Sequence, residues 1–142
     1  MRRLALILWL ALVPIVAADS GQRLAIPSWI ELTVPAGFSV STGNGRVALI
    51  EEGALRTPLM IEVLKTRPEG PPKHDSARQT PGGQAPWSLR RIQAAGSGGD
   101  EWILRVDHPL ATIIARQQRE FGQPDFARVW QVADSFKPVP AQ

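Results

Sequence analysis

The sequence contains no cysteine and no tyrosine, and only two histidines occur among its 142 residues. Without cysteine the chain can form neither disulfide bonds nor thiolate metal sites. The histidines, His74 and His108, have no further ligand-type residue at helical or strand spacing, so we predict no metal site and no cofactor. Stability must then come from packing. Four tryptophans within periodic segments are the expected core anchors: Trp29, Trp87, Trp102 and Trp130.

Blocks of like charge are also missing. Sixteen basic residues stand against 13 acidic ones, and arginines and glutamates alternate along the chain. The sequence pI of about 10.2 reflects a small basic excess in a chain that has no tyrosine or cysteine to titrate. A phosphate backbone or an anionic membrane would need a basic patch, so neither is a predicted partner.

The first 18 residues have the pattern of an export signal. Arg2 and Arg3 precede an apolar run from Leu4, and small residues end at Ala18. The apolar stretch of 15 residues is shorter than the roughly 20 that span a bilayer. No cysteine follows it for a lipid anchor. We expect cleavage after Ala18 and a freely diffusing protein of the bacterial periplasm, with secretion as the alternative. Cleavage removes Arg2 and Arg3, so the mature chain has 14 basic and 13 acidic residues.

Residues 19–142 have the length of a single domain, and apolar residues alternate through most of it. Period-two alternation predicts strands, and the pair Asn44 and Gly45 predicts a tight hairpin turn. We expect a meander of three or four strands, followed by a hairpin around a glycine-rich turn at 96–100. The predicted strands are 29–34, 38–40, 46–51, 59–65, 87–94 and 101–107.

The C-terminal part predicts one more strand and one helix. Residues 110–121 fit either a strand or an exposed helix, and we favour the strand. Apolar residues from Phe126 to Phe136 recur at spacings of three and four, which predicts an amphipathic helix. Pro124 suits its first turn, Asp125 complements its dipole, and Lys137 with Pro138 marks its end. The expected fold class is α+β: an antiparallel sheet of about six to seven strands in two hairpin groups, with the helix packed on it.

Residues 66–86 contain five prolines and three glycines and almost no large apolar residue. Such a segment cannot bury enough surface to offset the entropy of ordering it. We expect a loop that is mostly mobile linker, with a binding loop ordered by a partner as the alternative. Its polar residues are the first candidates for partner binding: Arg67, Glu69, Lys73, His74 and Arg78.

The turn at 95–100 places Ser97 between glycines, as in some hydrolases, and His108 lies nearby in sequence. A nucleophilic serine needs a strained elbow between a strand and a helix, with a histidine within hydrogen-bond reach. This serine lies between two strands, where turn geometry explains the glycines. We therefore predict no catalytic residue, and serine hydrolase is the least favoured function. Ser97, Asp100 and Glu101 join the candidates for partner binding.

Two pairs of acidic residues lie at predicted turns, Glu51 with Glu52 and Asp100 with Glu101. Such pairs could hold a weakly bound calcium ion, but adjacent carboxylates at a turn are usually only solvated, which is our interpretation here. Glycosidase chemistry would need two carboxylates facing one cleft. The sequence does not decide whether these pairs face each other.

Three stretches carry a resemblance to known families: IELTVPAGFSV, TPLMIEVLK and ARQQREFGQPDFARVWQVADSFKP. Together they resemble small exported domains of the PsbP-like α/β sandwich type. In the third stretch, this resemblance implies a strand that runs through a proline turn into one terminal helix, which favours the strand at 110–120. With GSGGDEWIL and PDFARVW, the chain also resembles periplasmic immunity proteins that neutralise cell-wall-cleaving effectors of the type VI secretion system. The resemblance implies a non-enzymatic inhibitor whose surface loops plug the substrate cleft of a secreted hydrolase.

A periplasmic protein-binding domain is therefore the favoured function, and an immunity protein is its most specific form. The alternative is a structural or stress-related protein of the cell envelope. The identity of the partner and the oligomeric state are left open by the sequence.

Overall fold

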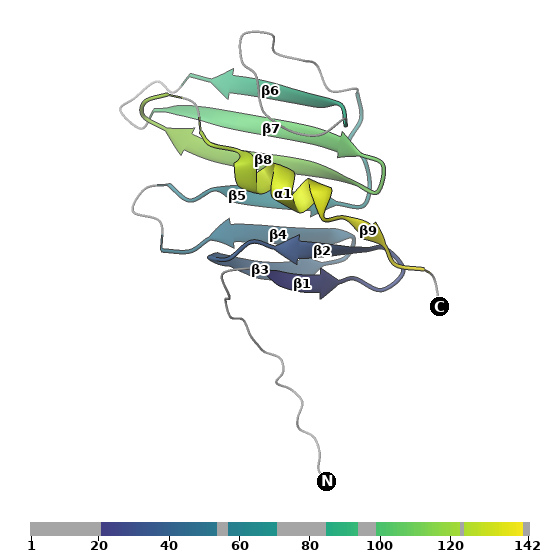
Figure 1. Ribbon diagram of the computed structural model, residues 1–142. Helices are drawn as coiled ribbons and strands as arrows, with labels where there is room; N and C mark the ends of the chain where they lie inside the picture. The colour runs from purple at the N-terminus through teal and green to yellow at the C-terminus, as the bar shows by residue number, and fades with distance from the viewer. Residues whose placement is uncertain (1–20, 54–56, 71–84, 94–98, 123, 141–142) are drawn as a thin grey trace.

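The computed structural model describes residues 21–53, 57–70, 85–93, 99–122 and 124–140. Two antiparallel sheets and one helix form the fold (Figure 1). The larger sheet has six strands, in the spatial order β3 (Phe38–Gly43), β4 (Arg46–Glu51), β5 (Met60–Leu64), β8 (Ala111–Arg119), β7 (Asp100–His108) and β6 (Trp87–Ile92). The smaller sheet has the order β1 (Gln22–Ala25), β2 (Ile30–Val34) and β9 (Lys137–Pro138), and the helix is α1 (Ala127–Asp134).

Alternating apolar residues explain how the larger sheet acquires a buried face. Val47 and Leu49 on β4 pair across the strands with Val63 and Ile61 on β5, and all four are fully buried. The same face continues through Ile113 on β8 to Val106 on β7. Every second side chain along each strand points to this face, and together these side chains form a single apolar surface.

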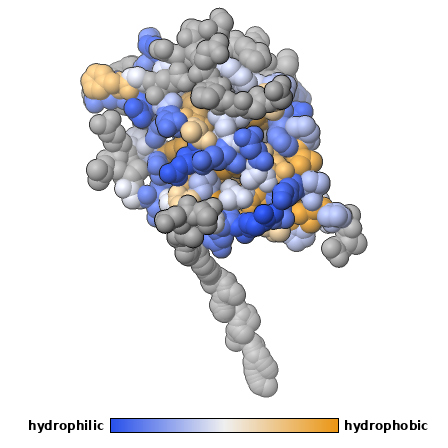
Figure 2. Space-filling view, in the orientation of Figure 1, coloured by the Kyte–Doolittle hydropathy of each residue, from blue (hydrophilic) through white to orange (hydrophobic). Residues whose placement is uncertain are grey.

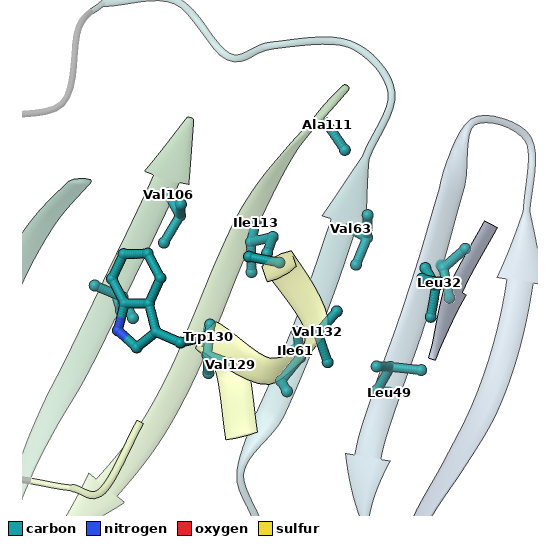
Figure 3. Packing of buried hydrophobic residues seen from close by; sticks show 14 of the residues in the cluster. Leu32, Leu49, Ile61, Val63, Val106, Ala111, Ile113, Val129, Trp130 and Val132 are labelled. Carbon is teal, nitrogen blue, oxygen red and sulfur yellow. The ribbon is translucent and has the colours of Figure 1, made fainter. Parts of the chain in front are cut away.

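The helix and the smaller sheet cover that apolar surface. In Figure 1 α1 and β2 lie in front of the six-stranded sheet, and Figure 3 shows Val129, Trp130 and Val132 of α1 directed toward the strands. Leu32 on β2 belongs to the same buried cluster. On its outward side this layer carries mainly hydrophilic residues, with apolar ones showing between them (Figure 2). The structure is thus α+β with a helix packed on an antiparallel sheet, as predicted.

Most of the predicted strands are confirmed. The strand favoured at 110–121 is β8, which lies between β5 and β7 in the larger sheet. Gly45 has a φ of 71° in the turn between β3 and β4, as expected at this hairpin. The hairpin of β6 and β7 also forms. Gly99 leads into β7 with a φ of 85°, and a Cβ there would lie 2.2 Å from the backbone oxygen of Arg119, so only glycine fits.

Three details of the prediction were wrong. First, β2 does not extend the meander, because its partners are β1 and β9 in the smaller sheet. Second, the helix begins at Ala127, so Pro124 and Asp125 precede it; Asp125 instead accepts a hydrogen bond from the Ala127 N–H at 2.9 Å. Third, Lys137 and Pro138 form β9 rather than the end of the helix, which is at Asp134.

A candidate protein-binding face

The second face of the six-stranded sheet lies opposite α1, and we call it the outer face. It carries every second residue of each strand, namely those whose side chains point away from the core. Among the described residues on this face, every cation is an arginine, and polar and apolar side chains are mixed. The outer face comprises Ser39, Ser41, Arg46, Ala48, Ile50, Met60, Glu62, Leu64, Ser88, Arg90, Ile92, Glu101, Ile103, Arg105, Asp107, Thr112, Ile114, Arg116 and Gln118.

One end of the outer face is crossed by residues 66–70, which follow β5 and which we call the strap. Its attachment is an ion pair on β7: Arg105 Nε lies 2.9 Å from Asp107 Oδ1, and the two side chains are 15% and 7% exposed. Arg105 Nη2 also donates to the carbonyl oxygens of Pro68 at 3.1 Å and Gly70 at 2.8 Å. The carboxylate thus holds the guanidinium in place, and the guanidinium holds the strap.

A second arginine attaches the start of the strap. Arg67 Nε donates to Thr112 Oγ1 at 3.2 Å, and its guanidinium also donates to the backbone oxygen of His108. Thr112 lies under the strap and is 1% exposed. The first residues of the predicted loop at 66–86 are therefore fixed on the sheet, while residues 71–84 lie outside the described part of the chain.

The predicted binding residues fall into separate groups. Arg67 and Glu69 are exposed on the strap, and Glu101 lies on the outer face near the other end of β7. At the rise of a strand, the six residue steps from Glu101 to Asp107 span roughly 20 Å. Asp100 points to the opposite face, where it forms an ion pair with Arg91 at 2.7 Å. Lys73, His74, Arg78 and Ser97 lie outside the described residues.

A second feature of the outer face was not predicted from the sequence. Next to the row that contains Arg105, side chains from five adjacent strands form one row across the sheet, which we call the exposed row. It consists of Ile50, Met60, Arg116, Ile103 and Arg90 in cross-strand register. Alternation marks each residue as facing the side opposite the core, but only the order of the strands brings the five together.

His108 is the histidine that a serine hydrolase, the least favoured function, would use. In the structure it is held by contacts with Leu110 and Phe136. Its Nδ1 accepts a hydrogen bond from the Leu110 N–H at 3.0 Å, and its ring packs edge-on against Phe136, with centroids 4.8 Å apart. Burial lowers the pKa of His108 below its usual value; Asp134 opposes this shift and Arg67 adds to it. The imidazole is therefore biased toward its neutral form.

The carboxylate of Glu51, at one of the two acidic turns, has a partner in the backbone. Glu51 Oε1 accepts a hydrogen bond from the Leu59 N–H at 3.1 Å, which ties this carboxylate to the turn between β4 and β5. Across the described ranges, no three histidine, aspartate or glutamate side chains gather as metal ligands would. Nor does any helix in those ranges have the length and hydropathy needed to cross a membrane.

Two comparisons with known proteins bear on this chain. A family described as the type six secretion immunity 3 domain matches residues 31–137, from β2 to the start of β9. The immune protein Tsi3 of Pseudomonas aeruginosa (strain PAO1) is 29% identical over 143 aligned positions, which cover 94% of this chain and 97% of that relative. The likeness thus includes both sheets and the helix.

Proposed function

Because this chain belongs to the type six secretion immunity 3 domain family, we propose that it binds and inhibits a secreted toxin that degrades the cell wall. The match over residues 31–137 is the observation that carries the proposal, since it spans nearly the whole described fold. The relative at 29% identity is itself named an immune protein. Inhibition by binding requires a stable surface and a complementary partner, and it requires no catalytic residue.

We place this activity in the periplasm. A toxin that cleaves the cell wall acts there, and an inhibitor must meet it in the same compartment. The export pattern of residues 1–18, with its apolar run and small residues at Val16 and Ala18, supports this address. Mass spectrometry of the protein purified from the periplasm should then give a chain that begins at Asp19.

The outer face supports binding as the mode of inhibition. Proline stiffens the strap, the strap is fixed by Arg105, and Arg67 and Glu69 are held on the same side of the sheet as Glu101. Polar groups that are ordered before binding lose less entropy when a partner is bound. We propose these three residues as contacts with the toxin. We also propose Lys73, His74, Arg78 and Ser97, and Asp100 at the start of β7, whose side chain lies on the opposite face.

Protection of living cells tests the proposal. The candidate toxin is the product of the neighbouring reading frame, because inhibitors are commonly encoded beside their toxins. Cells that export this toxin to the periplasm should lyse, and co-production of the full chain should prevent lysis. A variant without residues 1–18 is the matched control and should not protect. Lysis at the same rate with and without the full chain would refute the proposal.

Growth without the toxin separates this function from the alternative. A structural or stress-related envelope protein would be needed by the cell at all times. Deletion of the gene in a strain that also lacks the toxin should therefore leave growth unchanged if the chain is an inhibitor. A growth defect in that strain would favour the structural role.

A further inference from the structure

We propose that the exposed row of Ile50, Met60, Arg116, Ile103 and Arg90 is the centre of the toxin-binding surface and receives an acidic region of the toxin bordered by apolar side chains. This inference rests on the proposed function and adds the surface and the chemistry of the partner.

The first observation is the exposure of apolar side chains in cross-strand register. Met60 is 44% exposed and Ile50 is 36% exposed, and they are directly paired on β5 and β4. Ile103 continues the row on β7 and is partly exposed. In the next row Ile92 is 39% exposed. Five neighbouring strands make the exposed row about 19 Å wide, so its apolar groups form one surface rather than isolated residues.

The second observation is the charge of the exposed row. Arg46 and Arg105, elsewhere on the outer face, have close carboxylates: Arg46 Nε lies 2.6 Å from Glu62, and Arg105 pairs with Asp107. Arg116, by contrast, has its nearest carboxylate, Glu101, at 3.9 Å, and both side chains are more than 40% exposed. Arg90 is exposed and has no ion pair within the described ranges. The row therefore carries two guanidinium groups and no carboxylate of its own.

This composition matches the centre of a protein interface. Arginine and methionine are enriched there and lysine is depleted, and all four cations on the outer face are arginines. A guanidinium is more weakly hydrated than an ammonium and can bind a carboxylate through two hydrogen bonds. Exposed arginines beside methionine and isoleucine side chains thus favour a partner with carboxylates next to apolar groups.

The size of the row indicates how the rest of the surface takes part. A stable interface buries about 800 Å² on each partner, more than one row of five side chains supplies. Arg67 and Glu69 on the strap and Glu101 in the adjoining row are polar and lie around the exposed row on the same face. They have the position of a rim, where polar contacts surround an apolar centre.

A second copy of this chain is the less favourable occupant. A two-fold interface places the same surface of both copies together. The exposed row of each copy would bring two arginines and no carboxylate, so four guanidinium groups would lie near each other. Like charges disfavour this pairing, whereas an acidic partner removes the repulsion.

The experiment measures binding of purified chain variants to the candidate toxin by isothermal titration calorimetry. Arg90→Glu/Arg116→Glu reverses the charge of the row, and Ile50→Thr/Met60→Thr removes its apolar groups while keeping residues that favour strands. We expect each double variant to bind about tenfold or more weakly than the wild type. Arg90→Gln/Arg116→Gln should give a smaller loss, because it removes charge without repulsion.

Matched controls lie on the other side of the fold. Lys137→Glu reverses an exposed cation on β9, and Val40→Thr removes an apolar group that is 41% exposed and pairs with buried Leu49. Both should bind as the wild type does. Thermal unfolding followed by circular dichroism checks that each variant is folded; a row variant that unfolds early is replaced by Arg116→Gln alone.

Each outcome is decisive. Weaker binding by the row variants alone supports the inference. Wild-type affinity in the folded row variants overturns it and leaves the proposed function standing. Failure of the wild type to bind the toxin overturns the proposed function, and the inference with it. Concentration-dependent dimers that the same substitutions abolish would assign the row to a second copy and also overturn the inference.

Discussion

Arg105 and Asp107, two residues apart on β7, form a bidentate ion pair on the outer face. Arg105 Nε lies 2.9 Å from Asp107 Oδ1, and Arg105 Nη2 lies 3.2 Å from Asp107 Oδ2. The hydroxyl of Thr112 lies 3.5 Å from the same carboxylate. Because Arg105 also donates to the backbone of Pro68 and Gly70, the pair determines where the chain runs after β5. One local contact on a strand thereby positions a segment more than 30 residues away in sequence.

Removal of Arg105 should be costly because it leaves a buried carboxylate unpaired. For Arg105→Leu we expect a loss of about 3 kcal/mol in the free energy of unfolding. The double variant Arg105→Leu/Asp107→Leu should recover part of that loss, because no charge is left buried. Urea unfolding measures both. A loss below about 0.5 kcal/mol in the single variant would match an exposed ion pair instead and contradict this account.

Neighbouring residues on β7 test the assignment of the two faces. Leu104 is fully buried against the core, and Ile103 points to the outer face. Leu104→Ala should lower the free energy of unfolding by about 2–5 kcal/mol through lost contacts and a cavity. Ile103→Ala should cost clearly less in the same urea titration. Equal costs, or a larger cost at Ile103, would show that the faces are assigned the wrong way round.

Ser135 connects the helix to the smaller sheet. Its hydroxyl accepts a hydrogen bond from the Thr33 N–H at 2.9 Å and donates to the Val132 carbonyl at 2.7 Å. Ser135→Ala should cost about 1 kcal/mol in thermal or chemical unfolding. Ser41→Ala, at an exposed position on β3, is the matched control and should have no measurable effect. Equal stability of the two variants would mean that this bridge contributes nothing.

The pKa of His108 predicts a dependence of stability on pH. Burial lowers this pKa in the folded protein, with Asp134 opposing and Arg67 reinforcing the shift. Below the unfolded value of about 6.5, the unfolded chain therefore binds the proton more readily than the folded one. The contribution of His108 to stability is present above pH 6.5 and is lost as the pH falls through the lowered pKa.

Paired unfolding curves at several pH values isolate this contribution. The difference in stability between the wild type and His108→Gln should shrink as the pH falls from 7.5 to about 5. A difference that is constant, or that grows in acid, would contradict the lowered pKa.

The elements that the sequence predicted well are those whose burial is periodic. Ile61 and Val63 on β5, or Val129 and Ala133 on α1, repeat at the spacing of their element and are buried. β1 was missed because its residues are mostly exposed, and β9 because it has only two residues. The placement of β2 in the meander was wrong because alternation tells which face of a strand is buried but not which strand is its neighbour.

The candidate face was predicted less completely for the same reason. Arg67, Glu69 and Glu101 stood out as polar residues near turns and do lie on one face of the sheet. Arg105 and the exposed row were missed, because their roles depend on a strand order that joins distant segments. The resemblance to type VI immunity proteins is confirmed by the family match, while the likeness to PsbP-like domains and the signal peptide stay predictions.

Inhibition of purified toxin tests the central claim most directly. The candidate toxin, the product of the neighbouring reading frame, is incubated with isolated cell walls, and release of soluble fragments is followed while protein of residues 19–142 is added. We predict that fragment release falls steadily and stops near one molecule of inhibitor per molecule of toxin. Fragment release that is unchanged by an excess of folded protein would contradict the account.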